Sequence, residues 1–393
     1  PGAATLALEY NYYDGPWERP DQLARWNGLF RYVLGDDDDF ASVTFMGSDS
    51  VWDATDQVPR RAVRSGAIGR FGFVDPTVGG DTYRYSFSAD MQKTWDSGVT
   101  RASAYAGTYQ LDLYSNFTYF LDDPIRGDQF NQFDDRWFAG ATVDHTFEDL
   151  AFLGEGTDLT LGLQTHHDWI GDVGLHKSEA RRRFSTVRED EVYEASLSAF
   201  GVAETDWNPW LRTTAGLRGD LYYFDVDAKS LPANSGSDWD GIVSPKAGIV
   251  FGPWAETKFY LNGGLGFHSN DARGVTISRD PDSGDGISSV PPLVRTAGAE
   301  FGIRSQIIPD LTTTLARTVN DLIKPGLRHP AHFHNVGQRN TGNRRITHQR
   351  HHVVAMSAKH KRRNILDRHC LLYTSDAADE RGGVLGGGGG GGG

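Results

Sequence analysis

Residues 260–274 read YLNGGLGFHSNDARG, and residues 293–305 read LVRTAGAEFGIRS. Leu261, Leu265 and Phe267 fall on one face of the first segment, opposite Tyr260, Asn262 and the preceding Lys258. Such alternation is typical of a β-strand whose two faces meet different surroundings. The stretch therefore predicts a strand, a long polar loop and a second strand.

The same unit repeats through the preceding sequence. Between residues 83 and 92, Tyr83, Tyr85 and Phe87 lie on one face, while Arg84 and Ser86 lie on the other. Most predicted strands have about ten to fifteen residues, enough for a tilted strand to cross a bilayer, which takes about 9–11. We predict strands at 4–13, 23–34, 40–48, 82–94, 99–113, 135–148, 157–169, 191–205, 209–223, 241–252, 256–268 and 293–306, with a thirteenth beginning near 310.

The predicted connections alternate between short and long. The short ones are 35–39, 96–98, 149–156, 206–208, 252–255 and 307–310. The long ones are 49–81, 114–134, 170–190, 224–240 and 269–292. An antiparallel meander that turns tightly at one end and loops widely at the other is typical of an outer-membrane β-barrel. We therefore predict an all-β, antiparallel transmembrane barrel of the outer-membrane type.

Composition agrees with this class. The 393 residues include 47 Gly and 12% aromatic residues but only 38% apolar residues. A membrane barrel needs little apolar sequence because only alternate residues face lipid. No run of 18 apolar residues is present, which excludes a transmembrane helix. The single Cys370 excludes an internal disulfide framework.

Aromatic residues gather near the ends of the predicted strands. Two aromatic girdles at the two membrane interfaces would place them there, although strands are also enriched in Trp and Tyr generally. Those on the short-turn side are Trp95, Trp207, Trp210 and Trp254, and those on the long-loop side are Trp169, Tyr222, Tyr223 and Phe267.

Charge divides the chain into unlike parts. Residues 1–316 carry 26 Lys and Arg against 47 Asp and Glu, whereas 317–369 carry 12 against 2 together with eight His. The acidic part argues against nucleic-acid binding, because contact with phosphates needs a basic surface. Alternation stops after Ala316, so we predict an unstructured tail over 317–369 that arises from a frameshift or a chimeric join. Residues 370–393 (CLLYTSDAADE, then a run ending in eight glycines) are predicted to be a translated sequencing adaptor with poly-Gly.

The other end begins directly on strand-like sequence, TLALEYNYY, without a signal peptide. We therefore expect an N-terminally truncated chain. The three predicted parts are a partial barrel at 1–316, the tail at 317–369 and the artefact at 370–393.

Several short motifs resemble the barrels of TonB-dependent outer-membrane receptors. They are GFHSNDARG at 266–274, PLVR at 292–295, GAE at 298–300 and SPK at 244–246, and the resemblance extends over about 1–316. It implies a 22-stranded barrel, of which about 13 strands are expected here, together with a plug domain and a TonB-contacting segment that this sequence does not show. It further implies location in the bacterial outer membrane, contact with lipid, and coupling to the TonB complex through the missing segment.

The implied function is uptake of a scarce nutrient, with a ferric siderophore as the expected small-molecule ligand. A passive porin and a barrel-bearing outer-membrane enzyme remain as alternatives. Charged side chains in the long loops are candidates for ligand binding, although such residues are often simply solvated. The candidates are Trp52, Arg60, Arg61, Arg64, Arg181, Arg182, Arg183, His268, Asp271 and Arg273.

We predict no catalytic, metal or cofactor site. The GxSxG, HExxH and P-loop patterns are absent. His166 and His167 are adjacent in a strand and point to opposite faces, and residues 36–39 (DDDD) lack the ligand spacing of a calcium loop. The most metal-like spacing, His329, His332 and His334 with His351 and His352 beyond, lies in the suspect tail.

Overall fold

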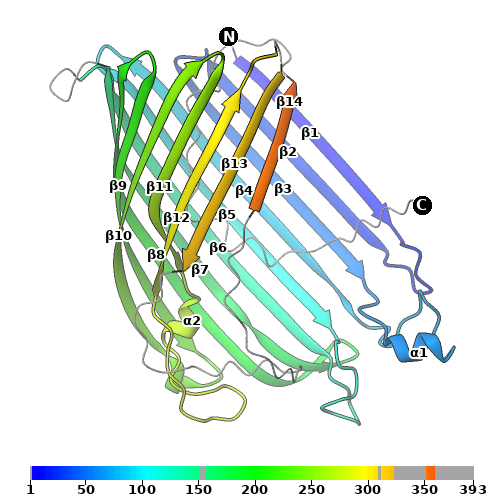
Figure 1. Ribbon diagram of the computed structural model, residues 1–393. Helices are drawn as coiled ribbons and strands as arrows, with labels where there is room; N and C mark the ends of the chain where they lie inside the picture. The colour runs from blue at the N-terminus through cyan, green and yellow to red at the C-terminus, as the bar shows by residue number, and fades with distance from the viewer. Residues whose placement is uncertain (1, 151–155, 309–310, 323–350, 359–393) are drawn as a thin grey trace, which may run out of the picture.

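Fourteen β-strands form one sheet in which each strand pairs antiparallel with its neighbour along the chain. The computed structural model describes residues 2–150, 156–308, 311–322 and 351–358, and the sheet curves into a barrel wall (Figure 1). The strands are Gly2–Tyr13 (β1), Leu23–Gly35 (β2), Phe40–Asp53 (β3), Gly79–Trp95 (β4), Gly98–Ser115 (β5), Phe130–Phe147 (β6), Thr157–Glu179 (β7), Arg182–Asn208 (β8), Leu211–Ala228 (β9), Gly236–Trp254 (β10), Thr257–Ser269 (β11), Leu293–Ser305 (β12), Leu311–Leu322 (β13) and His351–Ala358 (β14). The predicted all-β barrel class is confirmed.

Connections differ between the two ends of the wall, as predicted. At one end β4–β5, β8–β9 and β10–β11 are joined by two residues each. At the other end the β3–β4 connection contains helix α1 (Arg60–Arg64), the β9–β10 connection contains the 3₁₀ turn Pro232–Asn234, and the β11–β12 connection contains helix α2 (Ala272–Val275). Figure 1 shows α1 and α2 at this same end. We call it the long-loop end.

The prediction of a long loop at 170–190 is wrong. β7 and β8 continue as a hairpin through this region and are joined only by Ala180 and Arg181, both with positive φ. The hairpin carries polar residues on both faces, so apolar alternation is lost although the backbone ladder continues. The predicted loop 224–240 is likewise shortened, because β9 extends to Ala228 and β10 begins at Gly236.

The two faces of the wall differ in polarity. On β9, Leu217 and Leu221 are 57% and 47% exposed on the outward face, whereas Asp220 on the inner face is only 5% exposed. Exposed leucines avoid water when they face lipid, and polar residues are satisfied in a wet or filled lumen. No helix in the described part of the chain is both long and apolar enough to span a membrane.

A small apolar core lies on the inner face at the long-loop end. It consists of Ile170, Val173, Val192, Phe224, Val226, Ala228 and Ala272. Ala272 belongs to α2, so the β11–β12 connection folds back onto β8 and β9 instead of standing free in solvent. This packing fixes one external loop against the wall.

The aromatic residues follow the girdle prediction only in part. At the short-turn end Trp95, Trp207, Trp210 and Trp254 are all exposed, as a girdle requires. At the long-loop end Trp169 and Tyr223 are exposed, but Phe267 is 7% exposed and packs edge-on against Tyr222 with ring centroids 5.7 Å apart. The pairing of β11 with β10 ends at Gly264, so Phe267 lies beyond the part of β11 that pairs with β10.

The thirteenth strand occurs where it was expected, but strand structure extends beyond the predicted break after Ala316. β13 continues past Ala316 to Leu322, and His351–Ala358 pair with β13 as β14. The prediction of an unstructured tail is therefore wrong for these two stretches. The proposed frameshift or chimeric origin of 317–369 stays a prediction, and the predicted artefact at 370–393 lies outside the described residues.

Candidate functional site at the long-loop end

Three external connections are tied together at the long-loop end by one arginine. The guanidinium of Arg181, in the β7–β8 turn, donates to Asp53 Oδ1 (2.6 Å) and to the carbonyl oxygens of Thr77 (2.7 Å) and Val78 (3.0 Å). The backbone N–H of Arg181 donates to Gln129 Oε1 at 2.9 Å. Residues 77 and 78 close the β3–β4 connection, and Gln129 closes the β5–β6 connection. Arg181 therefore acts as a clamp between loops, which accounts for its donors without a ligand.

Asp75 extends the same network. Its carboxylate accepts from Asn116 Nδ2 (2.8 Å), Gln129 Nε2 (2.9 Å) and the backbone N–H of Thr77 (2.8 Å). Partial burial raises the pKa of Asp75, but these hydrogen bonds outweigh the burial and leave the pKa below its ordinary value. An ionised Asp75 thus holds the β3–β4 and β5–β6 connections together. We call Asp53, Asp75, Asn116, Gln129 and Arg181 the external network.

A cationic surface lies on the β3–β4 connection. Arg60, Arg61 and Arg64 belong to α1, and all three are exposed. Trp52 is half-buried near the end of β3, and its neighbour Asp53 is held by Arg181. The structure therefore brings Trp52 near the clamp and leaves the α1 arginines facing solvent.

Arg182 and Arg183 lie at the start of β8, not in a loop. Both are exposed. Arg183 stacks over the Phe133 ring at 4.5 Å, and its Nη2 lies 3.8 Å from Asp112 Oδ1. Of the three consecutive arginines, Arg181 is committed to the external network and Arg183 is partly engaged with the wall.

The remaining candidates form a second group around α2. Asp271 caps α2 by accepting from the Arg273 backbone N–H (2.9 Å), and the Arg273 guanidinium also pairs with the Asp271 carboxylate (2.6 Å). Arg188 donates to the Arg273 carbonyl oxygen (3.1 Å), and Glu194 accepts from the Ala272 N–H (3.2 Å). Asp271 and Arg273 therefore seat α2 on β8.

His268 lies at the end of β11, and its Nδ1 is 3.2 Å from the carbonyl oxygen of Ser269. It is half-buried, as is Arg273. Simple solvation, which was the alternative given for the charged candidates, therefore does not describe either residue.

A lumenal pattern was missed in the sequence. Oppositely charged residues two positions apart share one face of a strand, and such pairs recur on neighbouring strands. The signal in the sequence that could have revealed these pairs is an aspartate two positions from an arginine or a histidine. The pairs are Asp134 with Arg136, His166 with Asp168, Arg188 with Asp190, and Arg218 with Asp220.

Three of these pairs set an arginine beside an aspartate within one strand, so that the two charges offset each other locally. The side chain of Asp220 is fully covered, and its carboxylate accepts from Arg218 Nε (2.8 Å) and Ser198 Oγ (2.7 Å). A lumen lined in this way is polar yet internally paired.

The described residues contain no group of three His, Cys, Asp or Glu side chains that could hold a metal ion. His166 contacts Asp168 (2.7 Å) on the inner face, while His167 contacts Tyr193 (2.9 Å) and stacks on Trp169. The two histidines point to opposite faces, as predicted. His329, His332 and His334 lie outside the described residues.

Comparison with known proteins supports the fold alone. No family model and no curated protein matches this chain. The chain is similar to the ferric citrate transporter FecA in its unliganded form (10% identity, TM-score 0.66), covering 82% of this chain and 46% of that one. It is also similar to the closed form of the ferric-catecholate import receptor Fiu from E. coli K12 (11%, 0.61, covering 81% and 54%) and to the copper transporter OprC (15%, 0.58, covering 81% and 50%).

The architecture is thus that of an outer-membrane β-barrel wall. The predicted resemblance to TonB-dependent siderophore and metal receptors is confirmed at the level of the fold, and the chain spans about half the length of the solved structures it matches.

Proposed function

We propose that this chain is part of the barrel of a TonB-dependent receptor that imports a scarce nutrient, a ferric chelate of the siderophore type, across the bacterial outer membrane. The proposal includes a plug domain inside the barrel and coupling to the TonB complex through a segment before that plug. The solved structures of similar fold are iron-chelate and copper transporters or receptors, which supports uptake over enzymatic activity.

The observation that carries the proposal is the ordered surface at the long-loop end. The external network ties the β3–β4 connection to the β5–β6 connection and to the β7–β8 turn, so that α1 is held on a rigid base. Three exposed arginines on α1 then present positive charge to the exterior. Fixed cations on a preorganised loop raise the local concentration of an anionic ligand, and many ferric chelates are anionic.

The inner wall supports the same proposal. Its charges are arranged as ion pairs within single strands, such as Arg218 with Asp220 and Asp134 with Arg136. A wall of this kind suits polar contact with an inserted domain or with water. The outward leucines and the exposed Trp residues at the short-turn end support the outer-membrane location.

The test is uptake by cells that produce the complete receptor of which this chain is proposed to be a part, with radiolabelled ferric citrate, a ferric catecholate and Cu²⁺ as probes. We expect one ferric chelate to accumulate, and accumulation to stop when a protonophore removes the energy supplied by the inner membrane. Accumulation that continues without that energy would establish a passive porin instead. Hydrolysis of an ester or peptide probe by the purified protein would establish an enzyme.

Replacing the three α1 arginines together (Arg60→Gln, Arg61→Gln, Arg64→Gln) tests the site. We expect the rate of ligand capture to fall about tenfold at low ionic strength, with a smaller effect at high salt, because exposed charges act through long-range steering. Arg212→Gln is the matched control, since Arg212 is an exposed arginine at the short-turn end. Equal loss in both variants would show that α1 has no particular role.

A further inference from the structure

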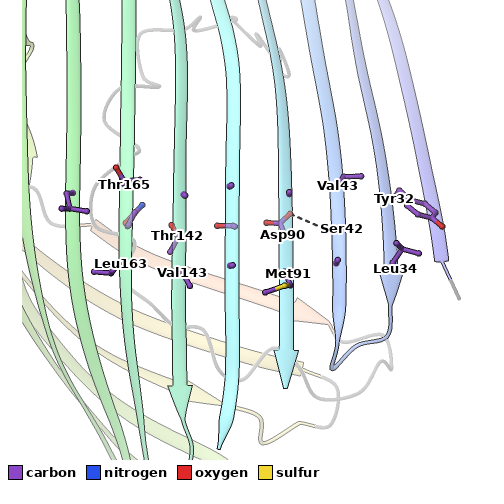
Figure 2. Close-up of a pocket in the computed structure, with 18 residues that line it drawn as sticks. Tyr32, Leu34, Ser42, Val43, Asp90, Met91, Thr142, Val143, Leu163 and Thr165 are labelled. Carbon is purple, nitrogen blue, oxygen red and sulfur yellow. Dashed lines mark hydrogen bonds between the residues drawn. The ribbon is translucent and has the colours of Figure 1, made fainter. Parts of the chain in front are cut away.

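A recess lies on the outward face of the wall, apart from the residues of the external network. Its volume is about 700 Å³, and it extends over β2 to β8 (Figure 2). Tyr32 and Leu34 bound it on one side, and Leu163 and Leu197 bound it on the other. Figure 2 shows the labelled side chains of these two borders on opposite sides of the recess.

The recess exists because many residues in two adjacent rows of the outward face are alanines, whose side chains are small. In one row Ala41, Met91, Ala102 and Val143 are neighbours across four strands, and in the next Val43, Ala89, Ala104 and Ala141 are neighbours. Five of these eight residues are alanine. We call the recess the alanine groove.

A polar row borders the groove on the side of the short turns. Lys93, Thr100 and His145 are register partners two residues nearer to the short turns, which is about 7 Å along the strands. Thr100 Oγ1 lies 2.8 Å from His145 Nδ1 and accepts from Trp95 Nε1 at 3.0 Å. Lys93 Nζ lies 6.0 Å from the centre of the Trp95 ring. Trp and Lys in this position mark the level of lipid headgroups.

Opposite charge lies beside this row. The β2–β3 turn, residues 36–39, contains four consecutive aspartates. It folds over the end of β4, where Gln92 Nε2 donates to the Asp38 carbonyl oxygen (3.1 Å). Asp37 and Asp38 are exposed, and Asp39 pairs with Lys93. Because Lys93 and Asp39 are themselves well exposed, their pairing is weak and leaves Lys93 able to attract an anion.

We propose that the alanine groove and its polar border bind one phospholipid whose headgroup carries both a phosphate and a free amine. An acyl chain fills the groove, the phosphate contacts Lys93 and the Thr100–His145 pair, and the ammonium group faces the carboxylates of Asp37 and Asp38. A purely anionic headgroup would meet the acidic turn, and a quaternary amine would donate no hydrogen bond to it. The inference rests on the proposed membrane location of the wall but not on the identity of the transported ligand.

The test is native mass spectrometry of the full chain after extraction into mild detergent, with vesicles of phosphatidylethanolamine, phosphatidylglycerol or phosphatidylcholine as the lipid source. We expect one phosphatidylethanolamine to be retained per chain, at least about tenfold more than either other lipid. Equal retention of the three lipids would overturn the proposal.

Filling the groove gives a sharper test. Ala104→Leu with Ala141→Leu should reduce retention at least about tenfold, whereas Ala215→Leu, at an exposed outward alanine of β9, should leave retention unchanged. Lys93→Gln should abolish retention and Lys93→Arg should preserve it. Asp37→Asn with Asp38→Asn should equalise retention of the ethanolamine and glycerol lipids.

Each variant is first checked for folding by its heat-dependent mobility on gels, and only folded variants are compared. Retention that survives groove filling would refute the site. A wild-type dimer that becomes monomeric on filling, with no change in lipid, would assign the groove to a second copy instead. The uptake assay distinguishes the two proposals. Lipid retention without energised uptake would refute the transport proposal alone. Energised uptake without selective lipid retention would refute the lipid site alone.

Discussion

The guanidinium of Arg181 lies 2.6 Å from Asp53 Oδ1, although the two residues are 128 positions apart in the sequence. This contact joins the β7–β8 turn to the end of β3 across three intervening strands. A single residue thereby links the β3–β4 and β5–β6 connections to the β7–β8 turn.

Arg181→Ala is expected to loosen the long-loop end by about 1–2 kcal/mol, because it removes charge-assisted hydrogen bonds from a partly exposed site. Alanine keeps the same left-handed turn conformation, so the variant isolates the side chain. Hydrogen exchange should accelerate in residues 54–78 and 116–129 and stay unchanged at the short turns. Arg182→Ala, at an exposed neighbour, is the control, and similar exchange in both variants would contradict the clamp.

The turn itself is strained. Ala180 and Arg181 have φ of 49° and 61°, a conformation that costs a non-glycine residue about 1–2 kcal/mol and that Asn tolerates better. Ala180→Asn should therefore raise the free energy of unfolding by about 0.5–1 kcal/mol. Ala255→Asn, at φ 47° in the β10–β11 turn, should give a similar gain. Ala199→Asn, on the outward face of β8, should destabilise the protein in urea unfolding from vesicles.

Acid should release the external loops. The folded pKa of Asp75 lies below its ordinary value of about 3.9. Its carboxylate therefore stabilises the network fully above that ordinary value, and the stabilisation is lost as pH falls through the depressed folded pKa. A nitroxide on Ser65→Cys, in a Cys370→Ser background, should become more mobile as the pH falls below about 4.

Asp75→Asn provides the control for this pH effect. It places amide donors against Asn116 and Gln129, so the label should be mobile already at pH 7, with little further change in acid. An unchanged acid transition in Asp75→Asn would assign the effect to another group.

Two Arg–Asp ion pairs on the inner wall differ in burial and can be compared directly. The Arg218–Asp220 pair contains a fully covered carboxylate, whereas the Arg212–Asp206 pair is about half exposed on both sides. Arg218→Ala should cost about 3–5 kcal/mol because it leaves a buried charge uncompensated. Arg212→Ala should cost no more than about 1 kcal/mol. Urea unfolding of both variants measures the difference, and equal losses would show that the lumenal pair is well solvated.

Seating of α2 can be tested at Ala272, which is fully buried against Phe224 and Val226. Ala272→Glu places a charge in this apolar contact and should release the β11–β12 connection, costing several kcal/mol of local stability. Limited proteolysis should then cut within 270–292. Arg279→Glu, in the same connection but away from the core cluster, should not change the cleavage pattern.

Much of the wall was predictable from the sequence. Strands such as 83–92 and 159–166 show strict alternation because one face meets lipid and the other meets the lumen. The alternation of short turns and long connections followed from the same pattern. The prediction from this pattern failed at 170–190, because the β7–β8 hairpin carries polar residues on both faces there and the two faces no longer differ in polarity.

The candidate site was predictable only as a set of charged residues. Arg60, Arg61 and Arg64 were expected at the surface, and they are exposed. Nothing local distinguished Arg181 from Arg182, yet one is a clamp and the other faces solvent. Their roles depend on Asp53, Thr77 and Gln129, which come from strands and loops far away in the sequence.

The sequence by itself determined that this chain forms an antiparallel barrel wall, because side-chain alternation is a local property that lipid and lumen impose on every strand. Only the tertiary structure decided which charges face solvent, which hold the loops, and where α2 is seated. Those outcomes depend on strand register and on the return of loops over the wall. The stretch 260–304 illustrates both, since its strands were read from alternation while the packing of its loop on β8 and β9 was not.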